Sequence, residues 1–143
     1  MKISFVVLLL LGGCSKHSNP ITTADGTVSL KTDSVEYKRS NSGVKILVTL
    51  KNEAGSPVVL HYAKNKIVFI VEEKFDTTWY TIDVFPPVNM TEDSLGSYQL
   101  QVNETYHDTL LVFGSSTCRI WTEYFIDPNH LVTIYSNLFT FVN

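Results

Sequence analysis

The chain has 143 residues, of which 44% are hydrophobic, 12% aromatic and 17% charged, with 11 basic and 14 acidic side chains. A hydrophobic share near that of globular proteins excludes a disordered or collagen-like chain. A formal net charge of −3 offers no basic surface for phosphates, which argues against a nucleic-acid-binding protein. The length favours one domain, large enough to bury a core of its own.

The first residues have the composition of a targeting segment. Lys2 supplies one positive charge, and Ile3 to Leu11 form an apolar run that only Ser4 interrupts. A helix of this length spans about 14 Å, less than half of the ~30 Å hydrocarbon core of a bilayer, so the run is too short for a transmembrane helix. A charged start, a short apolar centre and small residues at the end predict a secretory signal peptide.

The end of this segment is more specific. Leu11-Gly12-Gly13-Cys14 resembles the lipobox of bacterial lipoproteins, in which an apolar residue and two small residues precede an invariant cysteine. The resemblance implies that residues 1–13 are removed as a lipoprotein signal peptide. Cys14 then becomes the mature N-terminus, linked by a thioether to diacylglycerol, and its amine can carry a third acyl chain. The alternatives are an ordinary secretory signal with a coincidental cysteine and a cytosolic protein with an apolar start.

Two or three acyl chains anchor a protein stably in a membrane, whereas one chain does so only marginally. The membrane lipid is therefore one expected partner, reached through acylated Cys14. Ser15 follows the cysteine where an aspartate would retain such lipoproteins at the inner membrane, so the resemblance implies the outer membrane in a Gram-negative host. Residues 14–26 are polar, contain Pro20 and show no apolar period, which predicts a lipidated flexible tether with an extended reach of about 40 Å.

Residues 27–143 have the two-residue alternation of β-strands. The clearest run has an apolar face made by Val44, Ile46, Val48 and Leu50. Ile67–Val71 is apolar on both faces, which predicts a central strand, and Pro86-Pro87 predicts the end of the strand before it. No segment carries a sustained helical period. Eight or nine short strands with turn signals between them predict one all-β domain, an antiparallel sandwich or barrel.

Two groups of segments resemble bacterial Ig-like domains. The first is Cys118-Arg119-Ile120 with Tyr135-Ser136-Asn137-Leu138-Phe139-Thr140-Phe141, which resembles their last two strands. The second is Val48-Thr49-Leu50-Lys51-Asn52 with Pro57-Val58-Val59-Leu60, which is similar to one of their strand-to-strand transitions. The resemblance covers most of residues 28–142 and implies an Ig-like antiparallel sandwich of about seven to nine strands. Bacterial proteinase-inhibitor-like domains share this architecture and imply an alternative function, inhibition through an exposed loop such as Phe85–Ser97.

No contiguous catalytic or metal-binding motif occurs in the sequence. H-E-x-x-H, G-x-S-x-G, a phosphate-binding glycine loop and C-x-x-C are all absent. Glu72-Glu73 and His107-Asp108 are adjacent pairs, and neighbouring residues of a strand point to opposite faces. We therefore expect no catalytic residue, no metal and no cofactor. An envelope hydrolase with a noncontiguous site is the alternative.

Two further features have structural interpretations. Gly114-Ser115-Ser116-Thr117 superficially resembles a nucleophile turn, but it lacks a closing glycine and a following helix, so a plain hairpin turn is favoured. Cys118 lies in an apolar strand, which predicts a small, buried core residue rather than a catalytic thiol.

Four aromatic residues are the candidate ligand-binding side chains: Trp79, Tyr80, Trp121 and Tyr124. Exposed aromatic rings stack on sugars or peptides, although sandwich domains also bury a tryptophan in the core. Strand alternation places Trp121 between Arg119 and Glu123, on the face opposite Tyr124. An aromatic platform would bind an envelope glycan or an envelope protein, and core packing is the alternative.

Four aspartates precede a serine or threonine that is followed by Val, Leu or Thr: Asp33-Ser34-Val35, Asp76-Thr77-Thr78, Asp93-Ser94-Leu95 and Asp108-Thr109-Leu110. The triplet resembles an O-glycan acceptor of periplasmic and surface proteins of some bacteria, and ordinary turn chemistry is the favoured alternative. Together these features predict a lipid-anchored binding or accessory module of the cell envelope.

Overall fold

The computed structural model describes residues 27–88 and 95–143. The predicted signal peptide (1–13) and tether (14–26) lie outside the described residues, as do residues 89–94. The described part contains twelve strands and no helix. The strands are β1 (Val28–Thr32), β2 (Glu36–Lys38), β3 (Val44–Asn52), β4 (Val58–Ala63), β5 (Lys66–Ile67), β6 (Phe69–Phe75), β7 (Thr78–Phe85), β8 (Gly96–Leu100), β9 (Thr105–Val112), β10 (Thr117–Asp127), β11 (His130–Tyr135) and β12 (Phe139–Val142).

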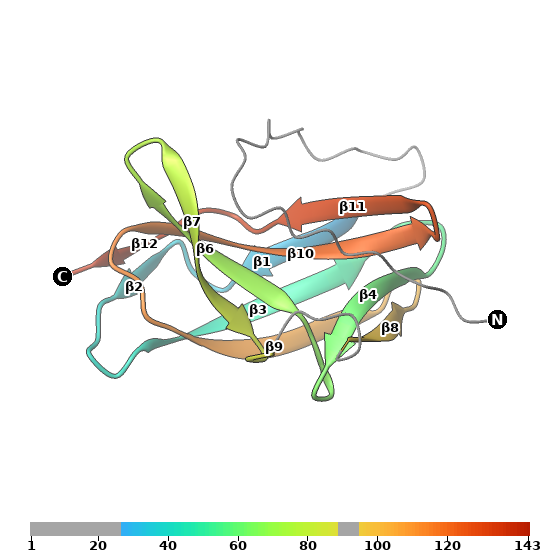
Figure 1. Ribbon diagram of the computed structural model, residues 1–143, viewed down its shortest axis with the longest axis horizontal. Coiled ribbons are helices and arrows are strands. Elements are labelled where there is room, and N and C mark those ends of the chain that lie inside the picture. Colours follow the sequence, from blue (N-terminus) through green and yellow to red (C-terminus); the bar gives the residue numbers. More distant parts are fainter. Residues whose placement is uncertain (1–26, 89–94) are drawn as a thin grey trace.

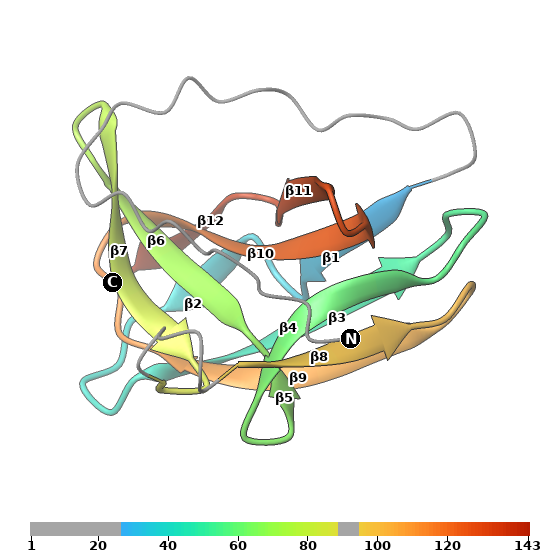
Figure 2. The ribbon, with the colours of Figure 1, turned by 45° about the vertical axis from the view of Figure 1, so that its right-hand side comes forward.

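The strands form two sheets that face each other as layers (Figures 1 and 2). The small sheet has the order β1-β3-β9. The large sheet follows β2-β12-β10-β4-β5, with β6 and β11 also paired to β10, β7 paired to β6, and β8 paired to β4. Both views show the β6–β7 hairpin projecting beyond the layers. The predicted all-β sandwich is confirmed.

The core lies between the sheets because each strand buries alternate residues. In β3, Ile46, Val48 and Leu50 are buried, whereas Lys45 and Leu47 are exposed. The largest fully buried side chains include residues of both sheets, among them Phe69, Leu110, Ile120 and Phe139. All residues of the core cluster fall between positions 28 and 141, so residues 27–143 enclose a hydrophobic core of their own.

Strand β10 organises the large sheet. It has eleven residues, rich in β-branched and aromatic types that favour strands, and it pairs antiparallel with β4, β6, β11 and β12 along different parts of its length. β12 also pairs with β2, and this pairing is parallel. The described part has more strands than the eight or nine expected, because short strands such as β2 and β5 are too brief to show an alternation in the sequence.

The apolar run and the proline pair agree with the sequence prediction. Ile67–Val71 is buried throughout, as expected for a central strand, although it divides between β5 and β6. β7 ends at Phe85, directly before Pro86-Pro87. Cys118 is fully buried in the core cluster, and burial, with the nearby Glu73 carboxylate, raises the pKa of its thiol to about 12. It has the predicted structural role.

The hairpin predicted at Gly114-Ser115-Ser116-Thr117 is wrong. β9 belongs to the small sheet and β10 to the large one, so these residues carry the chain from one layer to the other. A Cβ atom on Gly114 would lie 2.1 Å from Cε2 of Phe141, which explains why a glycine occupies this close crossing. A sequence can show that a turn occurs, but not whether the two strands that it joins pair with each other.

No helix in the described ranges is long and apolar enough to cross a membrane.

Candidate binding site

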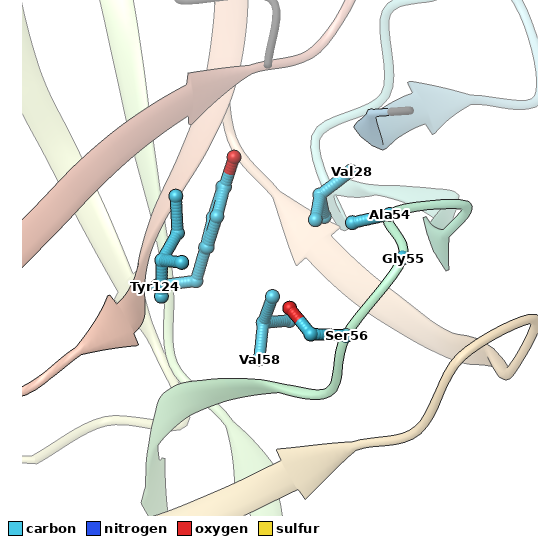
Figure 3. Close-up of a pocket in the computed structure, with 7 residues that line it drawn as sticks. Val28, Ala54, Gly55, Ser56, Val58 and Tyr124 are labelled. Carbon is cyan, nitrogen blue, oxygen red and sulfur yellow. The ribbon is translucent and has the colours of Figure 1, made fainter. Parts of the chain in front are cut away.

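A cavity of about 580 Å³ opens at the end of the sandwich where the described chain begins (Figure 3). β1 and the β3–β4 loop form one side of the cavity, and β4 and β10 form the other. Its lining residues are Val28, Ala54, Gly55, Ser56, Val58, Tyr124 and Ile126. This volume lies within the range of small-molecule sites. The lining side chains are apolar apart from two hydroxyl groups, although polar atoms contribute at least as much of the cavity surface as apolar atoms do.

The two hydroxyl groups belong to Tyr124 and Ser56. Figure 3 shows the Ser56 hydroxyl directed from the loop into the space beside the Tyr124 ring. Burial raises the pKa of Tyr124, so its phenol stays protonated and can donate a hydrogen bond at physiological pH. Neither hydroxyl has a hydrogen-bond partner within the described ranges, which leaves both available to a ligand.

A buried asparagine fixes the loop that forms one wall of the cavity. Asn52 is fully buried at the end of β3, and its Nδ2 donates to the carbonyl oxygens of Ser56 (3.0 Å) and Leu100 (3.1 Å). Its Oδ1 accepts from the backbone N–H of Ala54 at 2.9 Å. Two of these hydrogen bonds hold the loop and the third ties the same side chain to β8, so the cavity wall is preformed.

The outer face of the large sheet carries a stacked cation. The Arg119 guanidinium lies between two aromatic rings, 4.2 Å from the centroid of Trp79 and 4.2 Å from that of Tyr135. Its Nε donates to Oε2 of Glu72 at 2.7 Å, and only 8% of the residue is exposed. Cation–π contacts and a hydrogen-bonded ion pair together explain how a charged side chain is buried here.

His61 and Glu123 lie further along the same face. His61 Nε2 is 3.8 Å from Glu123 Oε2, which is too long for a hydrogen bond. Burial lowers the pKa of His61 and raises the pKa of Glu123, so each side chain is shifted toward its neutral form. The contact between His61 and Glu123 is therefore not a strong ion pair. In the part of the chain that the structure describes, three buried nitrogen atoms lack a hydrogen-bond partner: His61 Nε2, Arg119 Nη2 and Trp121 Nε1.

The four predicted aromatic residues do not form one platform. Tyr80 is 54% exposed on the β6–β7 hairpin, whereas one face of Trp79 is occupied by Arg119. Trp121 is half-buried on the outer face of β10, as the strand alternation predicts. Tyr124 lies on the opposite face, 6% exposed, and lines the cavity.

The sequence prediction missed Ser56 and Asn52. Ser56 gave no signal, because a serine in a polar loop is ordinary. Asn52 gave one: it continues the inward register of Val48 and Leu50, so a polar residue stood at a core position. Such a residue needs internal hydrogen bonds, and the turn-forming loop that follows it was the available partner.

The two members of each adjacent pair, Glu72-Glu73 and His107-Asp108, contact different partners. Glu72 binds Arg119, whereas Glu73 Oε1 accepts hydrogen bonds from the backbone N–H groups of Ser115 and Ser116, both at 2.6 Å. His107 Nδ1 lies 3.0 Å from Thr49 Oγ1. Asp108 binds Lys66 Nζ at 2.6 Å. Each pair is thus divided between opposite strand faces, as expected. Nowhere in the described ranges do three His, Cys, Asp or Glu side chains gather as a metal-binding group.

The Asp-Ser/Thr triplets have different settings. Asp33 accepts hydrogen bonds from the Tyr37 hydroxyl and the Leu47 backbone, and Asp76 occupies the β6–β7 turn with φ of 54°. Both agree with turn chemistry. Asp108 lies within β9 and does not. In the remaining triplet, Asp93-Ser94-Leu95, residues 93 and 94 lie outside the described residues. The centre of the loop Phe85–Ser97 also lies outside them.

No protein-family model matches the chain, and no curated protein matches it either.

Proposed function

We propose that this protein is a bacterial lipoprotein whose Ig-like β-sandwich serves as a binding or accessory module of the cell envelope, most simply at the outer membrane. The sequence Leu11-Gly12-Gly13-Cys14, after one lysine and a short apolar run, supports the anchor. The all-β body supports the Ig-like assignment. Acylated Cys14 binds the membrane lipid, and the folded body faces away from the cytoplasm.

The binding role is carried by one observation, the cavity at the end of the sandwich. It combines uncharged lining side chains, two hydroxyl groups that have no hydrogen-bond partner among the described residues, and a wall that Asn52 holds in place. Ligand sites in proteins are likewise concave and combine apolar side chains with a small number of placed polar groups. An envelope protein or glycan is the proposed partner of the outer face, where Trp79 and Trp121 lie.

The position of the cavity fits the anchor. Val28 lines the cavity and is the first residue of β1, so the cavity lies at the end of the sandwich that follows the tether. A tether over residues 14–26 reaches about 40 Å when extended. The cavity can thus approach the membrane surface and still remain in water.

The anchor is tested by replacing the cysteine. Cys14→Ser and the control Ser15→Ala are each produced in a Gram-negative host that grows with a radioactive fatty acid. The wild type and Ser15→Ala should incorporate label, lose residues 1–13 and dissolve from membranes only with detergent. Cys14→Ser should incorporate no label and keep residues 1–13. Label-free wild-type protein, or a Cys14→Ser protein processed like the wild type, would contradict the proposal.

A further inference from the structure

We infer that the cavity between the β3–β4 loop and β10 binds a neutral amphiphile, a molecule with an apolar chain or ring and one alcohol-like oxygen. The inference rests on the proposed binding function and names its ligand class. It follows from the lining, from the two hydroxyl groups and from the fixed loop.

The lining offers no counter-charge to a charged ligand. Val28, Val58 and Ile126 present hydrocarbon to the cavity, and Ala54 and Gly55 leave space because their side chains are minimal. None of the lining residues carries a charge. A carboxylate or ammonium group that entered would lose its hydration without gaining a counter-charge, which disfavours it strongly.

The two hydroxyl groups select for oxygen in the ligand. The Tyr124 phenol is a donor and an acceptor, and so is the Ser56 hydroxyl. A purely hydrocarbon ligand would cover both hydroxyls and leave them unpaired, whereas a ligand hydroxyl can bond to either one. An alcohol-like group is therefore favoured over both a hydrocarbon and an ion.

The wall of the cavity is already in place before a ligand binds. Asn52 holds the loop through Ser56 and Ala54 to the fully buried β3 end, and its second Nδ2 bond reaches Leu100 of β8. A wall fixed in this way limits the conformational entropy that a ligand must remove, and preorganisation of this kind improves affinity.

The test uses residues 27–143, which contain the hydrophobic core as the described residues form it, and the neutral fluorescent probe N-phenyl-1-naphthylamine. Ser56→Trp introduces a large side chain that fills the cavity from an exposed position. Ser97→Trp is the control, because it introduces the same side chain at an exposed position of β8. Octan-1-ol and octanoate at pH 8 then compete with the probe, because they share a chain length and differ in charge. Circular dichroism confirms a strand-rich fold for each variant before titration.

The wild type and Ser97→Trp should bind the probe saturably, and Ser56→Trp should bind it at least about tenfold more weakly. Octan-1-ol should displace the probe at a concentration at least about tenfold lower than octanoate, in line with the cost of an unpaired buried charge. Tyr124→Phe should weaken octan-1-ol binding by about fivefold relative to the wild type, the effect of one hydrogen bond.

Three results would overturn the inference: no saturable probe binding, equal binding by Ser56→Trp and Ser97→Trp, or octanoate competing as well as octan-1-ol. An unchanged octan-1-ol affinity in Tyr124→Phe would refute the role of the phenol. These outcomes are distinct from those of the anchor test, because the acylation of Cys14 does not depend on the cavity.

Discussion

Replacing Asn52 by alanine should destabilise the whole sandwich and loosen the cavity wall. The side chain makes three hydrogen bonds at 2.9–3.1 Å in a fully buried position. Each such bond contributes roughly 1 kcal/mol net, and the carbonyl and N–H groups left behind are partly buried. The expected loss in the free energy of unfolding is about 3 kcal/mol, a large fraction of the stability of a domain.

The assay is urea unfolding of residues 27–143, followed by the fluorescence of Trp79 and Trp121. Asn129→Ala, in the exposed β10–β11 turn, is the control and should stay within about 0.5 kcal/mol of the wild type. Asn52→Ala should also weaken binding of the naphthylamine probe, since the loop loses its attachment. An Asn52→Ala protein as stable as the control would refute the view that this side chain fixes the loop.

The remaining predictions concern three buried or partly buried groups. Arg119→Ala should lower the free energy of unfolding by about 3 kcal/mol in the same urea assay, because it leaves the Glu72 carboxylate without its partner; an unchanged midpoint would show that the stacked cation contributes nothing. Partial burial raises the pKa of Glu73, but its hydrogen bonds to the β9–β10 connection outweigh this and lower the pKa below 4.5. Glu73→Gln should therefore cost about 1–2 kcal/mol at pH 7, and the difference should disappear as the pH falls from 4.5 through the folded-state pKa; a pH-independent difference would contradict the assigned role. Cys118 should not react with a thiol reagent in the native protein and should react fully in urea, because burial raises its pKa to about 12; rapid native labelling would mean that the core opens.

Strand faces were predictable because they depend on local alternation. The inward face of β3 and the buried run Ile67–Val71 follow from the spacing of apolar residues alone. The termination of β7 before Pro86 is equally local, since proline cannot donate a ladder hydrogen bond.

Strand pairing and the cavity were not predictable, because both depend on distant residues. β10 divides its length among four partners, and the loop at Gly114 crosses between sheets although it has the composition of a hairpin turn. Tyr124 and Ser56 meet at the cavity although 68 positions separate them in the sequence. Strand alternation predicts which face of the sheet an aromatic side chain occupies. Whether that face meets the core or a cavity depends on the opposite sheet.

The most direct test of the account is the intact mass of the protein extracted from membranes with detergent. We predict a chain that begins at Cys14, lacks residues 1–13 and carries the added mass of a diacylglyceryl group, with or without a third acyl chain. A mass that corresponds to the unmodified 143-residue chain, or to a chain cleaved elsewhere and free of lipid, would contradict it.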